Sequence, residues 1–151
     1  MKTLNKSSIV IFCSLMEKMN GKQYLKISIE SYMPLSIEII GKSIITPFGM
    51  GSLYSLCHYY QQMGDLMKDP EMCFIVVDNR QEQAKAYEMV KIIPYLFQQD
   101  NAGLFEESVI FTDNKTTKYS PKMNADHAAF ANLWLGNIKN QGFLKPCAHN
   151  S

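Results

Sequence analysis

The chain has 151 residues, 46% of them hydrophobic, and its 15 basic and 14 acidic residues leave a formal charge of +1. This length suits one domain that buries a core without disulfides or metals, and the hydrophobic fraction excludes a disordered chain. The charge is balanced and Arg80 is the only arginine. Both features argue against a dedicated nucleic-acid binder, which carries a basic excess and reads bases with arginine.

The first expected element is a helix that begins at Ser7 or Ser8 and ends at Gly21. Its apolar side chains recur at helical spacing on one face, at Ile9, Phe12, Cys13, Met16 and Met19. Two lysines before a short apolar run also resemble a signal peptide, but charged residues follow closely and no small-residue cleavage site is present. We therefore favour the helix, and no span of the sequence is apolar for long enough to cross a membrane.

The pattern then changes to the alternation that is typical of strands. A turn is expected at 41–42 and a loop over 47–51. Residues 53–61 fit either a helix face or a strand, and their aromatic content favours the strand. Pro94 predicts a bulge or an edge position within a long strand. The expected extended segments cover residues 24–29, 35–39, 43–46, 53–61, 71–78, 87–97, 104–111 and a short stretch near 117.

A last helix is expected over about 124–141, followed by Gly142, with Phe143 packed on Ile138. Connections are short throughout, which disfavours parallel crossovers. The expected fold is α+β, an antiparallel meander sheet of about six strands with an N-terminal and a C-terminal helix packed on it. Residues 1–144 are predicted to form the single domain, and residues 145–151 a disordered tail.

The segment from 53 to 77 predicts a hairpin with Asp65 near its tip. In that register Cys57 lies opposite Cys73, and both faces of the hairpin carry apolar side chains and should be covered. Neighbouring strand residues point to opposite faces, so Cys57 and His58 cannot form a nucleophile–base pair. The four cysteines show no Cys-x-x-Cys spacing, and we expect them to be reduced thiols of a cytoplasmic protein.

The candidate binding residues are His58, Tyr60, Asp65, Asp69 and Glu71. The three acids, with the histidine, offer ligands for a divalent cation, which makes a metal-dependent enzyme the alternative function. Their spacing matches no calcium loop, and Gly-Asp and Asp-Pro pairs also suit tight turns, so we prefer a structural role for the acids. No catalytic residue, metal site or cofactor is predicted, and a non-enzymatic protein is favoured.

The block from 58 to 72 resembles the signature of a bacterial domain family of unknown function. It reads His-Tyr-Tyr at 58–60, Gly-Asp-Leu-Met at 64–67 and Asp-Pro-Glu-Met at 69–72. The C-terminal pattern also resembles that family, with Asp126-His127, Phe130-Ala131, Trp134-Leu135, Asn137-Ile138 and Gly142-Phe143. The similarity extends from Met16 to Leu144. It implies a cytoplasmic accessory protein of plasmids and conjugative elements, and it transfers no activity and no catalytic residues.

We therefore expect a non-enzymatic accessory or protein-binding module of a mobile genetic element, with a protein as its partner. Lys115, Lys118 and Lys122 beside Tyr119 offer a weaker nucleic-acid hypothesis, although we prefer to interpret them as a solvated turn. The strand at 87–97 would allow a homodimer if it lay at a sheet edge. The sequence leaves the oligomeric state open.

Overall fold

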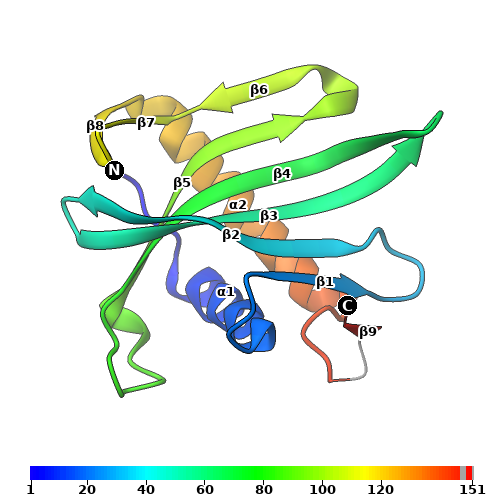
Figure 1. Cartoon of the computed structure of the whole chain (residues 1–151), viewed down its shortest axis with the longest axis horizontal. Coiled ribbons are helices and arrows are strands. Elements are labelled where there is room, and N and C mark those ends of the chain that lie inside the picture. Colours follow the sequence, from blue (N-terminus) through cyan, green and yellow to red (C-terminus); the bar gives the residue numbers. More distant parts are fainter. Residues whose placement is uncertain (147–148, 151) are drawn as a thin grey trace.

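The computed structural model describes residues 1–146 and 149–150. Helices α1 (Lys6–Met19) and α2 (Pro121–Gln141) cover one face of a curved sheet (Figure 1). Short 3-10 turns η1 (Tyr87–Met89) and η2 (Asp100–Ala102) flank one of its strands. The strands are β1 (Tyr24–Ser28), β2 (Leu35–Thr46), β3 (Gly49–Gln62), β4 (Asp65–Asp78), β5 (Val90–Gln99), β6 (Leu104–Glu107), β7 (Val109–Thr112), β8 (Lys115–Tyr119) and β9 (His149–Asn150).

The main sheet runs in the order β6-β5-β4-β3-β2-β1-β9 with antiparallel neighbours, while the β7–β8 hairpin joins it through a parallel contact between β8 and β2. The prediction of an α+β fold with a helix at each end is confirmed. The prediction of a six-stranded antiparallel meander is wrong, because eight strands lie between residues 24 and 119 and the sheet is mixed. The parallel contact arises where β2, bent by two bulges, meets the β7–β8 turn and Ile45 N donates to Asn114 O at 2.8 Å.

Both predicted helices are present, but their starts differ from the prediction. Asn5, rather than a serine, caps α1 by accepting a hydrogen bond from Ser8 N at 2.8 Å. Ser120 caps α2, and Pro121 occupies its first turn, so this helix begins three residues earlier than the expected residue 124. At its end Gly142 has a φ of 100°, and the helix closes there as predicted.

Two of the predicted breaks in the strands are wrong. The expected turn at 41–42 is a bulge inside β2, since Gly41 pairs with Leu53 and the strand continues. The expected loop over 47–51 shrinks to a two-residue connection between β2 and β3. The bulge at Pro94 is confirmed, and β5 pairs with β4 along its length but with β6 only over residues 96–99.

The core lies mainly between the helices and the sheet, and it includes the fully buried Phe12, Leu56 and Phe74. A smaller core on the opposite face contains Ile75 and Val109 and is partly covered by the β7–β8 hairpin. The predicted coverage of both faces of the β3–β4 hairpin is therefore correct where the β7–β8 hairpin lies over it. Farther along β1–β4 the same face of the sheet carries a groove. Of the predicted tail at 145–151, residues 147–148 and 151 lie outside the described residues.

Candidate functional site

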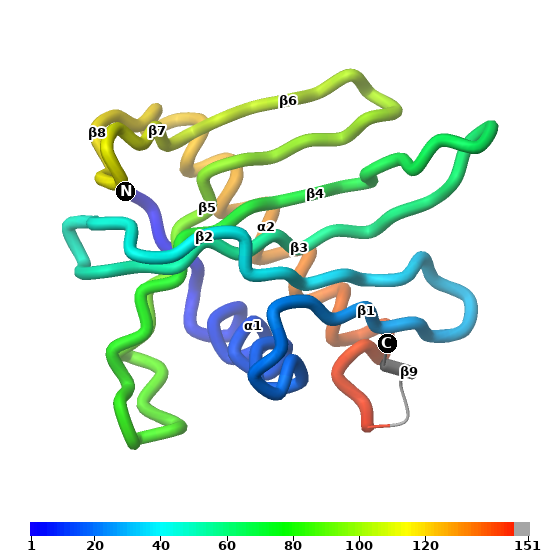
Figure 2. Tube along the Cα trace, in the orientation of Figure 1, coloured from blue at the N-terminus to red at the C-terminus, as the bar shows by residue number. Residues whose placement is uncertain are grey.

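The end of the β3–β4 hairpin, residues 58–70, forms a projection that we call the arm; Figure 2 shows it extending past the β5–β6 connection. Gln62 pairs with Asp65, so Met63 and Gly64 are the two central residues of the turn. Their φ angles are 52° and 87°, and positive φ at both positions is the requirement of a type I′ turn. The tip of the arm is therefore a tight turn.

The predicted register of this hairpin is wrong by two residues. Cys73 lies opposite Ser55, and Cys57 lies opposite Glu71. The tip is at 63–64 rather than at Asp65, and a bulge between Cys57 and Tyr59 adds a residue on β4. Because a shift of two residues preserves the alternation of a strand, the predicted faces are still correct. Cys57 and His58 point to opposite faces, as expected.

His58 lies on the helix side of the sheet and is buried. Its ring is 5.6 Å from those of both Trp134 and Phe143. Its Nδ1 is 3.2 Å from the carbonyl oxygens of Met33 and Pro34, and since both are acceptors, Nδ1 carries the proton. Burial lowers the pKa of this imidazole below its ordinary value. The neutral imidazole therefore stabilises the loop before β2 by donating a hydrogen bond to its backbone carbonyls.

Replacing His58 with asparagine should remove a pH dependence of stability. In the wild type the lowered pKa means that below about pH 6.5 the unfolded chain takes up a proton more readily than the folded one. The free energy of unfolding should therefore fall as pH decreases from about 6.5 toward the lowered pKa. Asparagine keeps an N–H donor but does not titrate. Urea unfolding at several pH values gives the free energy of unfolding as a function of pH. This free energy should fall less steeply with decreasing pH for His58→Asn than for the wild type, and an equal pH dependence in the two proteins would contradict this account.

The three candidate acids do not converge with this histidine. Asp65 is exposed at the tip, and Asp69 accepts a hydrogen bond from Gln99 Nε2 at 2.6 Å. Glu71 lies on the side opposite to His58, where Ser55 Oγ and Gln98 Nε2 donate to its carboxylate. Within residues 1–146 no group of three His, Cys, Asp or Glu side chains could hold a metal ion.

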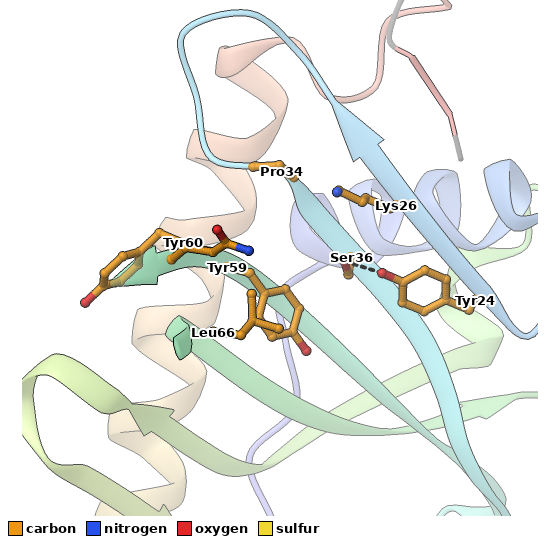
Figure 3. A pocket seen from close by; sticks show the side chains of 8 residues that line it. Tyr24, Lys26, Pro34, Ser36, Tyr59, Tyr60 and Leu66 are labelled. Carbon is orange, nitrogen blue, oxygen red and sulfur yellow. Dashed lines mark hydrogen bonds between the residues drawn. The ribbon is translucent and has the colours of Figure 1, made fainter. Parts of the chain in front are cut away.

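A groove of about 460 Å³ lies on the open face of the sheet, at the base of the arm (Figure 3). We call it the tyrosine groove, and its walls include Tyr24, Lys26, Pro34, Ser36, Tyr59 and Leu66. The Tyr24 hydroxyl is hydrogen-bonded to Ser36 Oγ at 3.1 Å. The candidate Tyr60 also lines the groove, although Figure 3 shows its ring turned away from that of Tyr59. The groove thus combines aromatic surface, hydroxyl groups and one cation.

Most of the residues of this groove were not predicted from the sequence. Tyr24 and Lys26 alternate with the buried Leu25 and Ile27, and the polar Ser36 stands between the apolar Leu35 and Ile37 of β2. That alternation was the available signal, since it separates a strand's core side from its other side. It does not say which strands are neighbours, so the sequence did not bring these residues together.

Two free thiols lie buried on the same face as the groove. Burial raises the pKa of both the Cys57 and the Cys73 thiol to about 12. Cys57 Sγ donates a hydrogen bond to His58 O at 3.4 Å, and burial raises the pKa of the Tyr59 and Tyr95 phenols as well. At neutral pH these groups are protonated, so they offer no thiolate nucleophile.

A second polar cluster joins α2 to the edge of the sheet. His127 Nδ1 lies 3.0 Å from Ser108 Oγ, and its Nε2 lies 3.0 Å from Glu106 Oε1. A serine, a histidine and an acid in contact are reminiscent of a hydrolase triad. However, Ser108 is 1% exposed and His127 is 4% exposed, so a substrate could not reach the hydroxyl. We interpret the cluster as a structural link.

The domain family described as "Domain of unknown function (DUF6908)" matches residues 8–144 of this chain. No curated protein and no solved structure matches this chain. Between residues 1 and 146, neither helix has the length and apolar character needed to cross a membrane.

Proposed function

We propose that this chain, which belongs to the DUF6908 family of unknown function, is a non-enzymatic protein-binding module whose contact surface is the tyrosine groove. The observation that carries the proposal is the composition of the groove, in which the rings of Tyr24 and Tyr59 line one hollow. Tyrosine is enriched at protein interfaces, because it offers a large apolar ring and a hydroxyl at little entropic cost. The volume also lies in the range of ligand-binding clefts.

The chemistry of the groove favours a protein segment with an apolar and an acidic side chain. Pro34 and Leu66 extend the apolar surface between the rings. Lys26 is the charged residue in the lining, and it can pair with a carboxylate. A peptide segment that presents both kinds of side chain would satisfy both parts of the surface.

The non-enzymatic assignment is supported by what the nearby reactive groups already do. Glu71 and Asp69 accept hydrogen bonds within the protein, and Cys57 is a buried, protonated thiol. Groups used in this way stabilise the fold rather than exchange protons with a substrate. The similarity of the 58–72 block is the support for an accessory role on a bacterial mobile element and for a cytoplasmic location, and both remain part of the proposal.

The test is affinity capture from the native host with matched variants. Leu66→Glu places a carboxylate in the groove, whereas Met50→Glu makes the same change at a similarly exposed site on β3, these side chains being 60% and 59% exposed. We expect the wild type and Met50→Glu to retain the same protein partner. We expect Leu66→Glu to recover about tenfold less of it, the effect of a loss of roughly 1.4 kcal/mol.

A partner that both variants retain equally would show that binding occurs elsewhere on the surface. Recovery of nucleic acid in place of protein would contradict the proposal. Mass spectrometry with nucleic-acid quantification distinguishes these results. Circular dichroism of the two variants checks that each is folded.

A further inference from the structure

We infer that the tyrosine groove receives the tip of the arm from a second copy of this chain, so that two copies form a symmetric dimer. Each tip would fill the groove of the other copy. This inference rests on the proposed function, because it names the partner of the same groove. The tip is defined as Met63, Gly64 and Asp65.

The tip has an unexpected residue for its backbone. Met63 is 98% exposed and has a φ of 52°, a conformation that residues other than glycine, asparagine and aspartate rarely adopt. Asparagine or glycine is strongly preferred at this position of a type I′ turn. An exposed methionine there lowers the stability of the single chain. A contact that buries the thioether would account for the residue.

The tip and the groove are chemically complementary. The tip offers the apolar Met63 beside the exposed carboxylate of Asp65. The groove offers tyrosine rings beside the exposed ammonium group of Lys26. The formal charge of the chain is only +1, so two copies approach without strong mutual repulsion.

The geometry allows both contacts to form around one axis. Tyr59 in the groove lies on β3, and Met63 at the tip is the first residue of the turn after β3, four residues further along the chain. At the rise of a strand this separation is about 13 Å. If two arms cross about a two-fold axis midway between these points, each tip lies over the groove of the other copy. A two-fold interface requires this kind of self-complementary surface.

The experiment measures the mass of the purified full chain by sedimentation, over about 1 to 100 µM, a range that covers micromolar affinities. We expect a dimer for the wild type. Lys26→Asp and Asp65→Lys should each weaken the dimer about tenfold or more, because each places like charges together. The double variant restores opposite charges and should recover most of the wild-type affinity. Both side chains are exposed, so their replacement leaves the core intact.

Met63→Asn provides a second variant, and we expect it not to destabilise the monomer. Asn-Gly is the preferred type I′ pair, so the monomer should melt at the same temperature or higher while the dimer weakens. Met50→Asn is the control, since it removes an exposed methionine outside the arm.

A wild type that is monomeric throughout the concentration range would overturn the inference. A dimer that these tip and groove variants leave unchanged would also overturn it, because the interface would then be elsewhere. Neither result contradicts the proposed function, which a different protein captured through the groove would still support. If capture shows no dependence on Leu66 while the purified chain is monomeric, both proposals fail.

Discussion

Phe12→Ala should lower the free energy of unfolding by about 3–5 kcal/mol, the cost of truncating a buried aromatic side chain. Phe12 is fully buried on α1, and its ring packs edge-on against Tyr54 of β3 at 5.8 Å and Phe74 of β4 at 5.2 Å. The substitution leaves a cavity where the helix meets two central strands. It also removes two aromatic pairs, each worth about 0.5–1.5 kcal/mol.

Urea unfolding at neutral pH measures this loss for Phe12→Ala. Leu133→Ala is the control, because Leu133 lies on α2 and is 66% exposed. The control should change stability by less than about 0.5 kcal/mol. A loss of similar size in both variants would mean that burial of the side chain does not explain the effect. A loss below about 1 kcal/mol in Phe12→Ala would contradict the packing of α1 on the sheet.

The helices could be predicted because their signals are local. Apolar residues at helical spacing identify α1 and α2, and the structure confirms both. Gly142 closes α2 as predicted, whereas Asn20 in the left-handed conformation, rather than Gly21, closes α1. Their first residues were harder to place, because several neighbouring side chains can cap a helix. Asn5 and Ser120 act as caps, whereas Ser7 and Ser8 lie inside the first turn.

The strands show why local signals are insufficient for a sheet. Gly41 is equally compatible with a turn and a bulge. What distinguishes the two is Leu53, whose side chain packs so closely on Gly41 that a Cβ there would lie 2.9 Å from its Cδ1. That neighbour is twelve residues away, on the next strand, and the local pattern around Gly41 does not contain it.

The groove depends on the same long-range information. Tyr24 lies on β1 and Tyr59 on β3, with β2 between them in the sheet. β2 contributes the small Ser36 to the lining, so the two tyrosine side chains border the same hollow. The sequence placed Tyr59 and Tyr60 on a strand correctly. It could not bring in Tyr24, because the expected turn at 41–42 placed a separate strand at 43–46 between the segments 35–39 and 53–61, whereas in the structure β2 is continuous and pairs directly with β3. The candidate His58, by contrast, was noticed as a residue type and lies in the core.

Gly51→Ala should destabilise the protein by about 1–3 kcal/mol, since it overfills a packed region. Gly51 lies on β3, and a Cβ at this position would be 2.5 Å from Cγ2 of Ile75. Ile75 is fully buried in the smaller core, and its branched side chain has few alternative rotamers. Val77 crowds the same point, with its Cγ2 at 3.3 Å. The methyl group can therefore be accommodated only if β3 and β4 move apart.

The same substitution at Gly136 should have the opposite sign. Gly136 lies inside α2, and a Cβ there would meet no atom within 4 Å. Alanine is favoured over glycine in a helix by about 0.5–1 kcal/mol, because glycine loses more backbone entropy on folding. Urea unfolding of the two variants should therefore give a lower free energy of unfolding than the wild type for Gly51→Ala and a higher one for Gly136→Ala. If Gly51→Ala also has a higher free energy of unfolding than the wild type, the contact of the new methyl group with Ile75 is relieved at little cost, and the predicted overfilling is wrong.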